Sequence, residues 1–273
     1  MMQDWDDAYR NAAHIENGAS YPARWNAAAL SFRESLSGQG RIRTDIAYGP
    51  RPRQLLDLFL PASTPYGLVV FVHGGYWMSF DKSSWSHLAR GAVEAGWAIA
   101  IPSYTLAPEA SVATITREIT DAILHAASLI GGPIRLAGHS AGGHLVTRMV
   151  CSNASLVPAT LRRIDHVLSI SGLHDLRPLQ CTEMNATLFH AAGEAAAESP
   201  ALLEPVPGTR LTCWVGADER PEFLRQNDLL ANIWTGLGAQ TRSVREPGRH
   251  HFTVIDGLAE AGSPLMQAFL PAA

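Results

Sequence analysis

One segment limits the fold of this chain more than any other: an apolar run that passes directly into a glycine-rich turn and then into a helical pattern. Residues 134–150 read Ile-Arg-Leu-Ala-Gly-His-Ser-Ala-Gly-Gly-His-Leu-Val-Thr-Arg-Met-Val. A serine on a sharp strand-to-helix turn has strained backbone angles, and neighbouring chains leave room only for small residues two positions before and after it. Gly138 and Gly142 meet that demand around Ser140. G-x-S-x-G also arises by chance, but the flanking strand and helix favour Ser140 as an exposed nucleophile.

Short apolar runs alternate with helical patterns from about residue 67 onward, which is typical of an α/β fold. The expected strands are rich in Val, Ile and Leu, as strands buried on both faces should be; they are residues 68–72, 97–101, 134–137, 166–170 and 211–215, with a weaker strand at 241–244. Residues 54–60 predict an early, partly antiparallel edge strand. Helices are expected at 115–130 and 221–237. The pattern predicts a mostly parallel central sheet with helices on both faces.

The first 45 or so residues differ from the rest of the chain. They are polar, show no strand pattern and hold four spaced aromatic residues, Trp5, Tyr9, Tyr21 and Trp25. We expect them to form an N-terminal helical arm that could lie over the sheet and over the site. No repeat or long polar linker divides the chain, so residues 1–273 are expected to form a single domain.

Charge and cysteine spacing exclude several classes of function. The net charge is −4, and nucleic acid or an anionic membrane surface would call for a basic patch. Cys151, Cys181 and Cys213 lie far apart, without the spacing of metal ligands, so neither zinc nor another metal is expected. There is no signal-peptide pattern and no apolar run of membrane-spanning length, which predicts a cytoplasmic protein.

A second glycine-rich turn follows the apolar strand at 68–72. Acyl transfer needs fixed N–H donors where the carbonyl oxygen becomes negative. One donor is expected from Ala141, the residue after the nucleophile, and the others from Gly75 and Tyr76, with Gly74 allowing the turn. His73 leaves its strand too early to reach Ser140 and is expected to organise this loop.

The acid should follow the nucleophile in the chain and precede the histidine. Asp218 is the predicted acid because it stands just past the apolar strand at 211–215, where a carboxylate can accept the Nδ1 hydrogen of a histidine. Asp175, after the preceding strand, and Glu219, next to Asp218, remain alternatives. A surface ion pair with Arg220 or Arg225 is the competing interpretation of Glu219.

The base is expected in a loop after the weak strand at 241–244. His250 and His251 are adjacent there and precede a helical pattern. Both would lie on the edge of the sheet that carries the nucleophile. The sequence pattern by itself leaves the choice between them open.

Three segments resemble the hormone-sensitive-lipase-like branch of the α/β hydrolases: 73–77 (His-Gly-Gly-Tyr-Trp), 138–143 and 104–109 (Tyr-Thr-Leu-Ala-Pro-Glu). The first is similar to the H-G-G-x-W motif of the kynurenine formamidases (arylformamidases). The resemblance spans roughly residues 68–258 and implies the α/β-hydrolase fold. His-Phe before an apolar helix start is similar to the family's catalytic histidine, which favours His251.

The same resemblance implies N-formylkynurenine as substrate, with no cofactor. Tyr76 stands where related esterases often have a third glycine. The larger tyrosine would narrow the part of the site that holds the acyl group. An aromatic cradle for the leaving group could come from Trp77, Trp85 and Tyr104, and from Trp25 of the arm. The alternative is a carboxylesterase acting on short-chain or aryl esters with the same machinery. The expected partner is a small ester or formamide, and a homodimer is possible.

Overall fold

The computed structural model describes residues 4–189 and 191–270. Eight strands form one sheet in the order β1-β2-β4-β3-β5-β6-β7-β8. The strands are β1 Ile42–Ala47, β2 Leu55–Phe59, β3 Leu68–Val72, β4 Ala98–Pro102, β5 Ile134–His139, β6 Ile164–Ile170, β7 Arg210–Gly216 and β8 Gln240–Glu246. β2 pairs antiparallel with both β1 and β4, and the remaining pairs are parallel. The predicted mostly parallel sheet and its antiparallel edge are confirmed.

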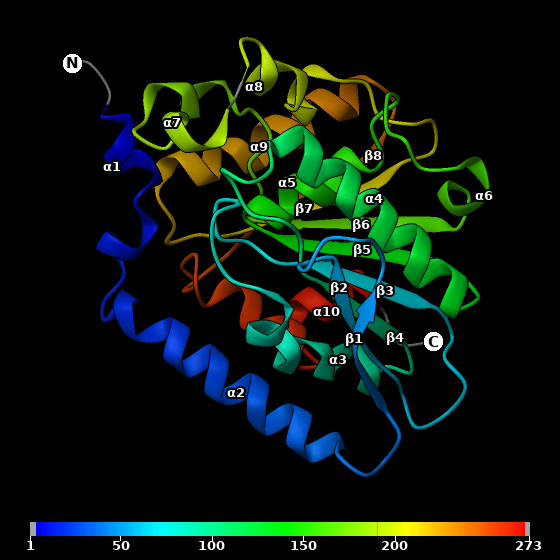
Figure 1. The fold of residues 1–273 in the computed structure, drawn as a ribbon. Helices are drawn as coiled ribbons and strands as arrows, with labels where there is room; N and C mark the ends of the chain where they lie inside the picture. Colours follow the sequence, from blue (N-terminus) through cyan, green and yellow to red (C-terminus); the bar gives the residue numbers. More distant parts are fainter. Residues whose placement is uncertain (1–3, 190, 271–273) are drawn as a thin grey trace.

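Two hydrophobic cores lie on opposite faces of this sheet. One holds side chains of α4 (Val112–Leu129), α5 (Ala141–Arg148) and α9 (Pro221–Gly236). The other holds side chains of α2 (Tyr21–Leu36), α3 (Arg90–Glu94) and α10 (Pro264–Phe269). Figure 1 shows these two sets of helices above and below the sheet. The helices expected at 115–130 and 221–237 are α4 and α9.

Local sequence explains the ends of the two long helices. Ser111 caps α4 because its Oγ accepts the backbone N–H of Thr114, and Gly131 and Gly132 follow the helix. Pro221 is the first residue of α9, where a missing N–H costs no intrahelical hydrogen bond.

Short helices and 3-10 turns make up the remaining helical structure of the described residues. The α-helical ones are α1 Trp5–Tyr9, α6 Pro158–Leu161, α7 Asn185–Leu188 and α8 Glu194–Ala197. The 3-10 turns are η1 Asn11–His14, η2 Gly18–Ser20, η3 Lys82–Ala89, η4 Arg177–Cys181, η5 Pro200–Leu202 and η6 Val254–Ala259.

The N-terminal segment is helical as far as Leu36, but residues 42–45, which we expected to belong to the arm, begin strand β1. That part of the prediction was wrong because β1 is an edge strand with mostly exposed side chains, so no apolar pattern marks it. A bulge at Asp45, whose φ is 56°, also breaks its regularity. Figure 1 shows the arm running from α1, beside α7, down to the long α2.

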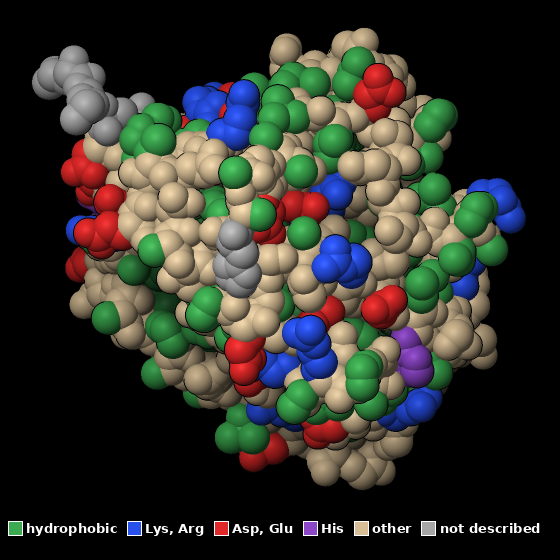
Figure 2. Space-filling view, turned by 45° about the horizontal axis from the view of Figure 1, so that its top comes forward, with side chains coloured by type: hydrophobic (Ala, Val, Ile, Leu, Met, Phe, Trp, Pro, Cys, Tyr) green, Lys and Arg blue, Asp and Glu red, His purple; other side chains and the backbone are tan. Residues whose placement is uncertain are grey.

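Charged and apolar side chains are mixed on the face that Figure 2 presents. Within residues 4–189 and 191–270, no helix has the length and apolar character to cross a bilayer.

Candidate active site

Ser140 lies on a tight turn between β5 and α5. Its φ of 56° and ψ of −118° are strained for a residue with a side chain, and its backbone N–H donates to the Ile170 carbonyl at 2.8 Å. The strained backbone of Ser140 agrees with the sharp strand-to-helix turn that the sequence predicted.

The glycines around the turn are required by close backbone contacts. A β-carbon added at Gly138 would stand 2.1 Å from the carbonyl oxygen of Gly142. One added at Gly142 would stand 1.9 Å from the carbonyl oxygen of Val72. Both positions exclude any larger residue, which is the crowding that the sequence pattern predicted.

His251 is paired with a buried carboxylate. Its Nδ1 lies 2.6 Å from Oε2 of Glu219, and both side chains are almost completely buried. The other carboxylate oxygen of Glu219 accepts hydrogen bonds from the Ser171 hydroxyl and from the backbone N–H of Gly216. Three donors thus fix the Glu219 carboxylate, which in turn orients the imidazole of His251.

The prediction that Asp218 is the acid was wrong. Asp218 is exposed, while its neighbour Glu219 is buried and faces His251. Adjacent residues on this turn after β7 point to opposite sides, and only the second points into the protein. Asp175, the other alternative, forms an ion pair with Arg177 at 2.9 Å.

Glu219 does not form the surface ion pair with Arg220 or Arg225 that was the competing interpretation, because both arginines pair with other carboxylates. Arg220 contacts Asp7 of the arm, and Arg225 contacts Glu222.

His250 points away from the site that His251 faces. Its Nδ1 accepts the backbone N–H of Phe252 at 3.2 Å, and its Nε2 lies 3.2 Å from the Tyr21 hydroxyl. Of the two adjacent histidines, His251 is therefore the one with a carboxylate partner.

The loop after β3 lies directly against the serine turn. A β-carbon on Gly74 would meet the Cβ of Ser140 at 2.9 Å, so glycine allows this approach. The φ values of Gly75 and Tyr76 are 104° and 50°. No acceptor in residues 4–189 or 191–270 takes their backbone N–H groups. Ala141, the first residue of α5, also has no intrahelical partner for its N–H.

His73 holds this loop from inside the protein. Its Nδ1 lies 2.8 Å from the Gly74 carbonyl oxygen, and its ring stacks on Tyr104 at 4.4 Å. Burial lowers the pKa of His73 to about 4, so the ring is neutral near pH 7. These contacts agree with the expected role of His73 as a loop organiser.

A cavity of about 400 Å³ brings the predicted residues together. Ser140, His251, Gly74, Gly75 and Tyr76 all line it. Most of the remaining wall is apolar or aromatic, with charged residues on the arm side; it includes Trp25, Met78, Phe80, Trp85, Met184 and Phe252, together with Asp6, Arg10 and Glu183. The cavity is large enough for a small aromatic substrate.

Two of the four aromatic residues expected in the substrate cradle lie elsewhere. Trp77 and Tyr104 are fully buried and belong to the core, whereas Trp85 and Trp25 do line the cavity. Trp77 packs edge-on against His144. It follows Tyr76 with a second positive φ, of 57°, on the tightly turned loop. That turn separates the two neighbours, leaving Tyr76 at the cavity and Trp77 inside.

The arm supplies a wall of the cavity, and its individual contacts were not specified by the sequence. Tyr76 donates its hydroxyl hydrogen to the Tyr9 carbonyl at 2.6 Å, and the Tyr9 hydroxyl donates to Glu222 at 2.7 Å. Arg220 and His14 both contact Asp7. The aromatic residues in an otherwise polar segment were the available signal, but nothing in their spacing indicated which loops they would contact.

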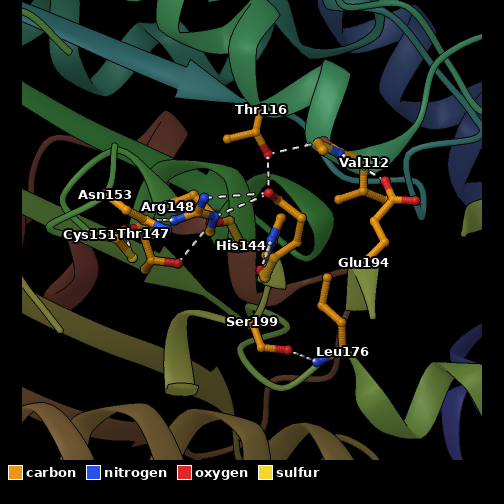
Figure 3. A network of polar contacts seen from close by, with 12 residues as sticks. Val112, Thr116, His144, Thr147, Arg148, Cys151, Asn153, Leu176, Glu194 and Ser199 are labelled. Carbon is orange, nitrogen blue, oxygen red and sulfur yellow. Dashed lines mark hydrogen bonds and ion pairs between the residues drawn. The ribbon is translucent and has the colours of Figure 1, made fainter. Parts of the chain in front are cut away.

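A buried polar network supports α5, the helix that follows Ser140. Arg148 Nε lies 3.1 Å from Oε2 of Glu198, and the Thr116 hydroxyl donates to the same oxygen at 2.8 Å. His144 Nε2 lies 2.7 Å from the Glu198 carbonyl. Figure 3 shows Thr116, His144 and Arg148 converging there. The network joins α5 to α4 and to the segment after α8.

A family model described as BD-FAE matches residues 56–206, which is more than half of the 273 residues. The chain belongs to the BD-FAE family. It is 25% identical to kynurenine formamidase of Danio rerio, over 98% of both chains. It is 31% identical to isoprenylcysteine alpha-carbonyl methylesterase of Arabidopsis thaliana, over 51% of this chain and 36% of that one.

The solved structures give the same fold. A putative thioesterase from Silicibacter sp. TM1040 superposes with a TM-score of 0.92 and 49% identity, over 98% of this chain and 99% of that one. With relatives that are formamidases and esterases, this member of the BD-FAE family is a hydrolase of the α/β-hydrolase fold. The resemblance to kynurenine formamidases inferred from the motifs is confirmed.

Proposed function

We propose that this protein is a serine hydrolase that removes the formyl group from N-formylkynurenine. The observation that carries the proposal is the His251–Glu219 pair at a cavity that also holds Ser140 and the Gly74–Tyr76 loop. Similarity to a kynurenine formamidase over 98% of both chains supports the choice of a formamide.

The proposed chemistry is a two-step acyl transfer. Ser140 Oγ attacks the formyl carbon while Nε2 of His251 takes the hydroxyl proton, and Glu219 stabilises the imidazolium. The N–H groups of Gly75, Tyr76 and Ala141 would receive the negative oxygen. The C–N bond then breaks, and His251 gives the proton to the departing aniline nitrogen.

The second step regenerates the enzyme. A water molecule loses a proton to His251 and attacks the formyl ester on Ser140. When the tetrahedral intermediate breaks down, His251 returns the proton to Ser140 Oγ and formic acid leaves, which ionises to formate in solution. Each proton taken by His251 is returned, so the cycle needs no other reactant.

The cavity wall supports a leaving group with an aromatic part and a charged part. Trp25 and Trp85 form an apolar section of the wall, while Asp6 and Arg10 lie on the arm side. Kynurenine combines an aromatic ring with an amino-acid end. Tyr76 lines the same cavity as Ser140 and takes up space there that a glycine would leave open, which suits the smallest acyl group.

The alternative is a carboxylesterase acting on short-chain or aryl esters. The same residues would cleave an ester, and one relative is a methylesterase that matches 51% of this chain. An ester is intrinsically easier to cleave than an amide, so ester hydrolysis alone would not separate the two functions.

A kinetic comparison of N-formylkynurenine with p-nitrophenyl acetate tests the proposal. We expect kcat/KM for the formamide to exceed that for the ester once the intrinsic reactivity of each leaving group is allowed for. Ester cleavage without release of formate from N-formylkynurenine would establish the esterase instead.

The cytoplasmic location and the homodimer stay predictions.

A further inference from the structure

His139 is the residue before the nucleophile and the last residue of β5. Its side chain is 4% exposed and lies between two loops of the site. On one side its ring is 4.6 Å from the ring of His251, and on the other its Nδ1 would stand 3.3 Å from a β-carbon on Gly74. His139 thus touches both the base and the loop after β3.

One polar contact of His139 reaches the main chain of the base itself. Its Nε2 lies 2.9 Å from the carbonyl oxygen of His251. A carbonyl can only accept, so Nε2 of His139 carries the hydrogen and Nδ1 is bare in the neutral ring. No backbone N–H of residues 4–189 or 191–270 donates to that carbonyl. The His139 side chain therefore supplies the hydrogen bond that this buried oxygen needs.

The two ends of this hydrogen bond differ in rigidity. β5 lies in the middle of the sheet, between β3 and β6, and Ser140 is bonded to β6 through the Ile170 carbonyl. His251 belongs to a turn between β8 and η6. Glu219 restrains its imidazole, and His139 restrains its backbone. Two restraints are needed because a ring held only at Nδ1 can still shift with its loop.

We propose that His139 is a positioning residue that fixes the backbone of His251 relative to Ser140, so that the imidazole reaches the serine hydroxyl. The proposal rests on the proposed role of Ser140 and His251, but not on the choice of formamide or ester. Burial and the neighbouring His251 hold the pKa of His139 well below its usual value. A neutral neighbour does not oppose the imidazolium that forms on His251 during each step.

The test compares side chains at position 139 that differ in one donor. In His139→Gln the amide nitrogen lies as many bonds from Cβ as Nε2 of histidine, so it can donate to the same carbonyl. His139→Leu has similar bulk and no donor, and His139→Asn has a donor one bond too short. His125→Leu and His125→Gln, on α4 away from the cavity, are the matched controls.

We expect His139→Leu and His139→Asn to lower kcat by about 10²-fold at unchanged KM, because a misplacement of roughly 1 Å has that effect. We expect His139→Gln to recover most of the rate. The assay is p-nitrophenyl acetate hydrolysis, with the melting temperature of each variant measured in parallel. If His139→Leu does not fold, the comparison of Gln with Asn decides, since both are polar amides.

Two results would overturn the proposal. One is a kcat of His139→Leu or His139→Asn equal to that of the unmodified protein. The other is an equal loss in His139→Gln and His139→Asn, which would indicate a need for the imidazole rather than for its donor. A protein that cleaves p-nitrophenyl acetate but not N-formylkynurenine would remove the proposed formamidase function and leave this test unaffected.

Discussion

Replacing Glu219 with glutamine should remove most of the activity while leaving the protein folded. In the structure one oxygen of Glu219 accepts the Nδ1 hydrogen of His251, and the other accepts from Ser171 and Gly216. A glutamine has the same shape, and its single oxygen can keep the second set of hydrogen bonds. Its NH₂ group then faces Nδ1 of His251.

The expected loss follows from the histidine tautomer. Facing an NH₂ donor, the imidazole must present a lone pair at Nδ1, so its hydrogen moves to Nε2. That nitrogen can no longer accept the proton of Ser140. A carboxylate-to-amide change of this kind lowers kcat by about 10⁴-fold in a serine triad, which corresponds to about 5.4 kcal/mol in the activation barrier.

The effect on stability should be much smaller. Glu219→Gln weakens the buried hydrogen bond between the Glu219 carboxylate and His251. A hydrogen bond to a charged group contributes about 1.5–3 kcal/mol to the free energy of unfolding. Asp218→Asn is the matched control, because it makes the same change one residue earlier on an exposed side chain. A surface substitution of this kind should stay within about 0.5 kcal/mol of the original stability.

The assay is p-nitrophenyl acetate hydrolysis, with urea unfolding of each variant. Folded Glu219→Gln with kcat near that of the original protein would refute the assignment of the acid. So would a large loss in Asp218→Asn, because the structure gives that side chain no part in orienting His251.

Three further predictions concern the nucleophile, the buried histidines and the acyl group. Ser140→Ala should lower kcat by roughly 10⁴- to 10⁶-fold with the melting temperature retained, and a serine-directed phosphonate should no longer label the protein; continued labelling would contradict this. Burial lowers the pKa of His73 and His174 to about 4 and that of His144 to about 3, from 6.5. Between pH 6.5 and about 4 the unfolded chain therefore binds more protons than the folded protein. As the pH is lowered through this range, the unfolding free energy should decrease, by up to about 1.4 kcal/mol per pH unit for each histidine. Urea unfolding at pH 7.5, 6 and 5 measures this, and equal stabilities would show that these rings are not held neutral. On one aryl leaving group, kcat/KM should fall from formyl to acetyl to butyryl, by about 10- to 200-fold for one methylene, because Tyr76 narrows the acyl side; a flat series would favour the esterase.

Local patterns in the sequence were enough to predict most of the sheet and the turn that carries Ser140. Strands buried on both faces must be continuously apolar, so most of them were recognisable without the structure. Gly138 and Gly142 are required because a β-carbon at either position would stand 2.1 or 1.9 Å from a backbone carbonyl oxygen, so only glycine fits. Both glycines stand at a fixed spacing from Ser140, so the pattern is readable in the sequence even though Val72 belongs to another strand.

Only the tertiary structure decided which of two neighbouring residues faces the site. Asp218 and Glu219 are both carboxylates after the same strand, and their orientation depends on how the turn packs against Ser171 and the loop of His251. Tyr76 and Trp77 were separated in the same way, by a turn with two positive φ values.

The arm shows the same limit over a longer distance. Tyr9 meets Tyr76 and Glu222, which are 67 and 213 residues away in the chain. No periodicity or spacing encodes such contacts, because they depend on where the folded sheet places three separate segments. The sequence by itself determined the fold and the glycine pattern around Ser140. The packing of distant segments determined which carboxylate pairs with His251 and which aromatic side chains line the cavity.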